Sequence, residues 1–202
     1  MLAEVAVIPS APLLVPELTG PGAPEAVAVR DAVRAAGVSL AEAARRWIAV
    51  GATPGDGPAV IPLRGTFAGY GVDLPVVLSP IADAGPAAPG MPLSMLVAAW
   101  LRGQCSGGEA SRVGDEIVVE PLGVPAGATP QRCRALGETL TARLAASDEP
   151  VGLLVVGDGA NALSRTAPGG GERESAWALQ RKIDAALAAA DGPALAALDP
   201  DE

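Results

Sequence analysis

Four short runs of apolar residues are spaced along the chain, and each is bounded by proline, glycine or charged positions. Runs of this length that are rich in Val, Ile and Leu are typical of strands in a buried parallel sheet. The last run, VGLLVVG, is apolar throughout, which indicates a strand covered on both faces. The predicted strands span residues 3–9, 46–52, 115–124 and 151–157.

Segments with helical spacing alternate with these strands. The first interleaves valines with arginines, and Gly37 is its predicted end. Thr129 is the predicted N-cap of another, with Pro130 in its first turn. The predicted helices span residues 23–36, 92–104, 129–147 and 172–190. This alternation predicts one α/β domain over residues 1–202, with a largely parallel central sheet and helices on both faces.

Composition limits the partners. Half of the 202 residues are apolar, enough to bury a sizeable core. The net charge is −9 and basic residues form no cluster beyond pairs, so nucleic-acid binding is not expected. No stretch is long and apolar enough to span a membrane, and none resembles a targeting segment. We therefore expect no membrane partner. Cys105 and Cys133 are isolated thiols without metal-ligand spacing, so we expect a reduced, cytoplasmic protein. A homo-oligomer stays an open alternative.

Polar side chains that could bind a ligand lie in three loops that follow predicted strands. In open parallel sheets, ligands bind in the crevice outside the carboxyl ends of the strands. The first of these loops, PSAPLLVP, is stiffened by prolines, which would hold its serine at the mouth of such a crevice. The candidate crevice residues are Ser10, Thr53, Asp56, Asp158 and Asn161.

These residues also have structural interpretations. A serine in a turn often bonds its own backbone, so Ser10 could serve only to cap its loop. Asp56 and Asp158 each precede a glycine, and Asp-Gly pairs are common turn formers.

The most informative count is that of histidine, which is zero. Hydrolysis at a zinc ion of the usual His-bound kind and Ser-His-Asp catalysis are therefore excluded.

The order of the turns resembles the class III extradiol ring-cleavage dioxygenase superfamily, especially the branch related to the β chain of protocatechuate 4,5-dioxygenase. Members carry Pro-His-x-Pro after the first strand, where this chain has PSAP at residues 9–12. They carry Gly-Asp-x-Ser-His after a late strand, where this chain has GDGAN at residues 157–161. The segments FAGYGVDLP and MPLSMLVAAWL are also similar to those of small actinobacterial members.

This resemblance implies an ancestral Fe(II) site of two histidines and a glutamate, with a further histidine as acid and base. By position, the first ligand becomes Ser10, the second falls within residues 53–56, and the catalytic histidine becomes Asn161. The glutamate is expected near the C-terminal end, where Glu202 is the final residue. A serine hydroxyl is a poor Fe(II) ligand beside imidazole, and an amide exchanges no proton near neutral pH. The resemblance together with these substitutions thus implies a catalytically degenerate member without a metal, a cofactor or catalytic residues, which would serve as a binding or assembly module for an unknown ligand.

Two further interpretations stay open beside residual dioxygenase-family activity. A histidine-free enzyme would use Asp56, Asp158 or Glu17 around a hard cation such as Mg²⁺ or Mn²⁺. An interaction protein would dock a partner or a second copy through the apolar helix at residues 95–101, provided that one face is exposed.

Overall fold

The computed structural model describes residues 1–20, 24–57, 59–80, 85–106, 116–167 and 171–198. The chain divides into two compact units, Met1–Gly157 and Asp158–Glu202, and each is described by itself. The single domain expected from the sequence stays a prediction.

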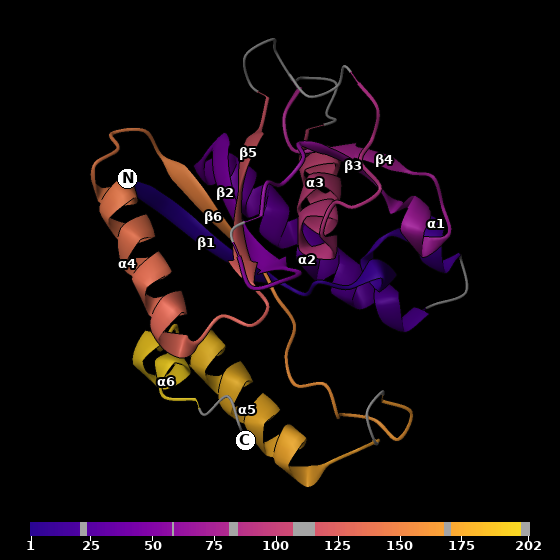
Figure 1. Ribbon diagram of the computed structural model, residues 1–202, viewed down its shortest axis with the longest axis vertical. Helices are drawn as coiled ribbons and strands as arrows, with labels where there is room; N and C mark the ends of the chain where they lie inside the picture. The colour runs from indigo at the N-terminus through magenta and orange to yellow at the C-terminus, as the bar shows by residue number, and fades with distance from the viewer. Residues whose placement is uncertain (21–23, 58, 81–84, 107–115, 168–170, 199–202) are drawn as a thin grey trace. The chain divides into compact units, whose positions relative to one another are not determined.

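A four-stranded, all-parallel sheet forms the centre of the first unit (Figure 1). The strands lie in the order β1-β6-β2-β5. They are β1 (Leu2–Ile8), β2 (Arg46–Thr53), β5 (Val118–Pro125) and β6 (Val151–Val156). All four predicted strands and their parallel arrangement are confirmed.

Helices cover both faces of this sheet (Figure 1). On one face, α2 (Pro24–Ala43) and α3 (Leu93–Cys105) contribute to the main hydrophobic core. On the other face, α4 (Pro130–Ala145) packs its buried Leu144 with Ile48 of β2 and Val151 of β6. The predicted α/β class, with a parallel sheet between helical layers, is therefore confirmed.

The helix α3 lies deep in the first unit. Every residue from Met95 to Leu101 is at most 3% exposed. The docking hypothesis required one exposed face on residues 95–101, and this condition is not met, because the core of the first unit covers these residues.

The helix α2 does not end at Gly37 as predicted but continues to Ala43. A Cβ atom added at Gly37 would lie 2.7 Å from Cδ1 of Leu101 and 2.9 Å from Sγ of Cys105. The glycine therefore permits a close approach of α2 to α3 instead of ending the helix.

Smaller elements connect the sheet to its helices. The loop after β1 forms a short 3-10 helix, η1 (Pro12–Leu14), and one helical turn, α1 (Pro16–Thr19). A separate antiparallel pair, β3 (Arg64–Thr66) and β4 (Pro75–Val77), is joined through the 3-10 helix η2 (Phe67–Tyr70).

The second unit contains α5 (Glu174–Ala188) and the short α6 (Gly192–Ala196). The helix α5 lies within the range predicted from the sequence. In the described part of the chain, no helix has both the length and the apolar character needed to cross a membrane.

Candidate functional site: a crevice at the ends of β1 and β2

A crevice with a volume of about 570 Å³ lies at the carboxyl ends of β1 and β2. Small-molecule sites typically measure roughly 300–1,000 Å³, so this hollow is of ligand size. Its polar side chains are Ser10, Tyr70 and Ser94. Among the described residues that line it, none is acidic or basic. The site thus offers hydroxyl groups and apolar surface.

Ser10 is carried on a loop that the rest of the first unit holds firmly. Arg30 of α2 donates a hydrogen bond from Nε to the carbonyl oxygen of Leu14 at 2.8 Å, and one from Nη2 to that of Leu13 at 3.3 Å. Leu14 and Val15 are buried in the core. The proline-rich loop is therefore fixed by tertiary contacts as well as by its prolines, and it places Ser10 at the crevice.

The opposite wall joins the end of β2 to the start of α3. Ser94 donates a hydrogen bond from Oγ to the carbonyl oxygen of Ala52 at 2.9 Å. A Cβ atom at Gly51 would lie 2.5 Å from Cβ of Ser94, so only glycine permits this approach. The bond uses the Ser94 proton, which leaves the oxygen of that hydroxyl as an acceptor.

Tyr70 forms an aromatic wall on a fixed turn. Its ring meets that of the buried Phe67 edge-on, with centroids 6.1 Å apart. Oγ1 of Thr66 accepts from the amide of Ala68 at 3.1 Å and donates to Oδ1 of Asp73 at 2.7 Å. Gly71 ends the turn with φ at 97°, a conformation that favours glycine. The half-exposed Tyr70 ring is therefore preorganised.

Ser10 lines the crevice, but Thr53 and Asp56 are not among the residues that line it. Thr53 is 1% exposed, its Oγ1 has no hydrogen-bond partner among the described residues, and its methyl group packs over Gly123 of β5. Asp56 lies in the following turn, where its backbone oxygen accepts from Nη1 of Arg132 at 2.9 Å. Of these three predicted residues, Ser10 lines the crevice.

Asp158 and Asn161 belong to the second unit, where both are exposed. Gln180 of α5 fastens their loop, since its Oε1 accepts from the amide of Ala160 at 2.9 Å. A Cβ atom at Gly159 would lie 2.1 Å from that oxygen, so a larger residue there would displace the Gln180 side chain. The loop therefore has a defined structure on α5. Glu202 lies outside the described residues.

Sequence reasoning missed three residues that shape these loops. Tyr70 is the single tyrosine of the chain and stands in a glycine-flanked turn, which was a usable signal. Ser94 is the lone hydroxyl in the apolar segment MPLSMLVAAWL, a second usable signal. No local pattern distinguished Gln180, because its role depends on a loop about twenty residues away.

Among the described residues of the first unit, no carboxylate lines the crevice. Glu17 lines a smaller hollow of about 240 Å³ together with Trp100 and Arg102. Within the described ranges, no three His, Cys, Asp or Glu side chains gather as metal ligands.

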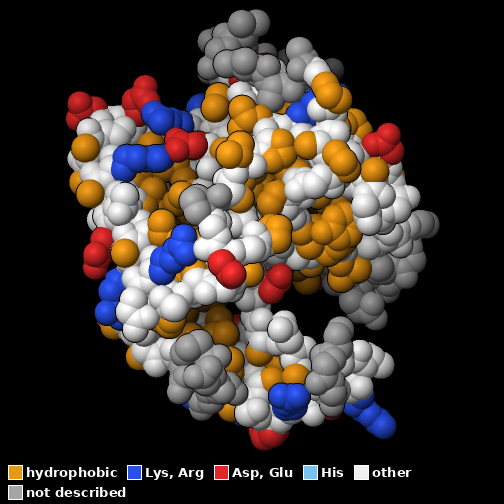
Figure 2. All heavy atoms as spheres, viewed as in Figure 1, with side chains coloured by type: hydrophobic (Ala, Val, Ile, Leu, Met, Phe, Trp, Pro, Cys, Tyr) orange, Lys and Arg blue, Asp and Glu red, His pale blue; other side chains and the backbone are white. Residues whose placement is uncertain are grey.

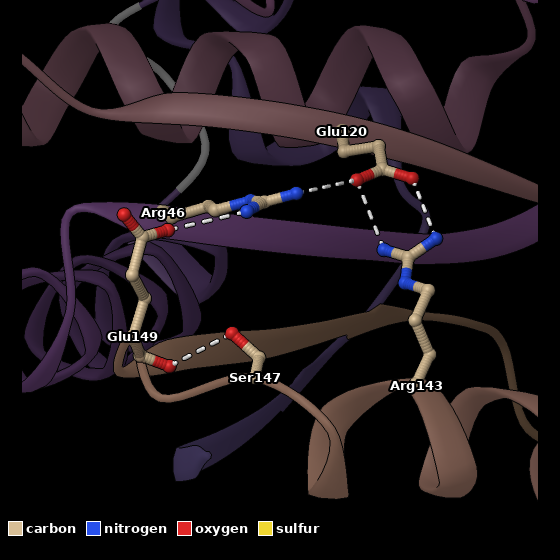
Figure 3. Close-up of polar contacts among 5 residues, drawn as sticks. All are labelled: Arg46, Glu120, Arg143, Ser147 and Glu149. Carbon is tan, nitrogen blue, oxygen red and sulfur yellow. Dashed lines mark hydrogen bonds and ion pairs between the residues drawn. The ribbon is translucent and has the colours of Figure 1, made fainter.

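A charged cluster lies at the amino ends of the strands (Figure 3). Glu120 accepts two hydrogen bonds from Arg143 at 2.7 and 2.9 Å, and it also pairs with Arg46 at 3.5 Å. Arg46 in turn pairs with Glu149 at 3.2 Å. Each charged side chain in the figure thus has an opposite charge beside it. The cluster links α4 and the turn before β6 to the sheet. Because these ion pairs are exposed, each contributes about 0–1 kcal/mol to the free energy of unfolding.

Charged and apolar side chains separate on the face drawn in Figure 2. Acidic and basic groups gather at the upper left, over the end of α4 and the starts of β2 and β5. Apolar side chains dominate the part of the face around α3. The crevice lies at the carboxyl ends of the strands and the charged cluster at their amino ends, so the two are at opposite ends of the sheet.

Together these observations define an α/β protein of the open parallel-sheet class, with a candidate binding crevice outside the carboxyl ends of two strands. A scan against protein-family models and a search of curated proteins both find no match for the chain.

Proposed function

We propose that this protein is a catalytically degenerate relative of the class III extradiol ring-cleavage dioxygenases and that it binds a small molecule in the crevice. The observation that carries the proposal is the position of Ser10. It lines a ligand-sized crevice at the carboxyl end of β1, where the resemblance puts the first iron-binding histidine.

The chemistry of the chain supports binding without ring cleavage. Extradiol chemistry of the ancestral kind needs imidazole groups both to hold Fe(II) and to move a proton, and the chain contains no histidine. Hydroxyl groups such as those of Ser10 and Tyr70 can still orient a ligand by hydrogen bonds.

Iron analysis of protein produced in iron-replete medium tests this proposal directly. We expect far less than one Fe per chain after desalting, and no ring-opened product when catechol or protocatechuate is added with Fe(II) and ascorbate. An active extradiol dioxygenase assayed in parallel verifies the conditions. Stoichiometric, tightly held iron together with catechol turnover would refute the proposal.

The alternative of carboxylate chemistry around a hard cation has its own test. If Asp56 held Mg²⁺ or Mn²⁺, either ion would raise the melting temperature, and Asp56→Asn would remove the increase. We expect no increase with either ion. A shift that Asp56→Asn removes would favour the alternative.

A further inference from the structure

We infer that the crevice selects a neutral ligand with an aromatic ring and discriminates against anions and cations of the same shape. This inference rests on the proposed function, because it names the class of molecule that the crevice binds. It is carried by the absence of acidic and basic side chains from the described residues that line the crevice, together with the fixed aromatic wall.

The described lining of the crevice offers an opposite charge neither to a cation nor to an anion. An ion that leaves water needs an opposite charge or several strong hydrogen bonds to offset its lost hydration. A cation would find no carboxylate among the described lining residues, and an anion would find no guanidinium or ammonium group there. The net charge of −9 further disfavours an anion. A neutral molecule avoids all of these costs.

The walls favour a flat ring. The Tyr70 ring is held edge-on by buried Phe67, so it can receive an aromatic ligand without first being ordered. Pro54, Pro89 and Pro92 add rigid apolar surface around the same hollow. Most of the ligand contact area would therefore come from preformed, uncharged surface.

The polar groups favour a ligand that both donates and accepts hydrogen bonds. Ser94 is 3% exposed and its proton is used on the carbonyl oxygen of Ala52, so any contact of its oxygen with a ligand is as an acceptor. The Tyr70 hydroxyl, on a side chain 44% exposed, can either donate or accept. A neutral amide or hydroxyl group on the ring matches this pair.

Benzamide, benzoate and benzamidine provide a matched set of probes, because they share one ring and one planar substituent and differ in charge at neutral pH. Their affinities are measured by ligand-observed NMR titration of the full chain. We expect benzamide to bind at least about tenfold more tightly than either charged analogue, equivalent to about 1.4 kcal/mol.

Two variants locate the binding. A Cβ atom at Gly90, which lines the crevice, would meet nothing within 4 Å, so Gly90→Leu adds a bulky side chain at the border of the hollow without a clash at its Cβ. Gly137 on the surface of α4 is equally open, and Gly137→Leu is the matched control. Gly90→Leu should weaken benzamide binding at least about fivefold, and Gly137→Leu should leave it unchanged. Tyr70→Ala, which removes the aromatic wall, gives an independent second measurement should Gly90→Leu fail to fold.

Two results would overturn the inference. One is binding of benzoate or benzamidine that equals that of benzamide and is lost in Gly90→Leu; this result would still support a binding crevice. The other is that benzamide does not bind at all, or that neither Gly90→Leu nor Tyr70→Ala weakens its binding. Neither result bears on iron content or catechol turnover, so the inference and the loss of dioxygenase chemistry fail separately.

Discussion

Gly51 and Ser94 touch so closely that a Cβ atom on the glycine would lie 2.5 Å from Cβ of the serine. This approach lets Ser94 donate its hydrogen bond to Ala52 at 2.9 Å. The contact joins the end of a central strand to the first turn of a buried helix, and the crevice lies beside it.

Replacement of Gly51 by alanine should therefore displace the start of α3. We expect Gly51→Ala to lower the free energy of unfolding by about 1–3 kcal/mol, the usual cost of overpacking a filled interior. Urea denaturation measures the change. An unchanged midpoint would show that α3 can shift at no cost and that this contact does not fix the crevice wall.

The two helix glycines at positions 37 and 137 should respond to alanine in opposite directions. Gly37→Ala should destabilise the protein, because its new methyl group would lie 2.7 Å from Cδ1 of Leu101. Gly137→Ala meets open space on α4 and should stabilise it by up to about 1 kcal/mol, since alanine favours the helix over glycine. Thermal melts of both variants give the comparison. Stabilisation by Gly37→Ala would contradict the close packing of α2 on α3.

The two cysteines should differ in reactivity. Burial raises the pKa of the Cys105 thiol from 9.0 to about 11, whereas Cys133 is exposed on α4. Because the thiolate is the reactive form, iodoacetamide at mildly alkaline pH should label Cys133 at least about tenfold faster than Cys105. Mass spectrometry of peptides measures both rates, and Cys133→Ser isolates the slow one. Equal rates in the folded protein would contradict the burial of Cys105.

Because of the same thiol, the free energy of unfolding should decrease at alkaline pH. The folded state keeps the Cys105 proton up to its raised pKa, while the unfolded state loses it near the ordinary value of 9.0. The associated stabilisation is therefore present below pH 9 and lost as the pH rises toward 11. In urea denaturation, the stability difference between the native chain and Cys105→Ala should shrink over that range. A constant difference would rule out the coupling.

Removal of Gln180 should loosen the loop that carries Asn161. The amide of Ala160 loses its acceptor in Gln180→Ala, so its hydrogen exchange should accelerate by about tenfold or more. Gln180→Glu retains an acceptor oxygen and serves as the control, although it places a carboxylate near Asp184. An unchanged exchange rate in Gln180→Ala would show that another contact holds the loop.

Local patterns in the sequence are sufficient to identify the four strands of the central sheet, the main helices and the α/β class. Apolar runs bounded by proline and glycine marked the four strands, and Thr129 with Pro130 marked the start of α4, where Oγ1 of Thr129 accepts from the amide of Arg132. These signals are local, since side-chain periodicity and capping act over a few neighbouring residues. The sequence also indicated the Ser10 loop, because prolines stiffen a chain wherever it lies.

The roles of individual glycines and hydroxyl groups depend on contacts between segments that are far apart in the sequence. Gly37 resembled a helix stop in the sequence, yet it accommodates Leu101, more than sixty residues away. Thr53 has the same kind of polar side chain as Ser10, but the pleat of β2 turns it onto Gly123 inside the unit. Tyr70 and Ser94 reach the crevice through contacts between distant segments. Local sequence does not encode such contacts, because they depend on which surfaces meet when strands and helices pack.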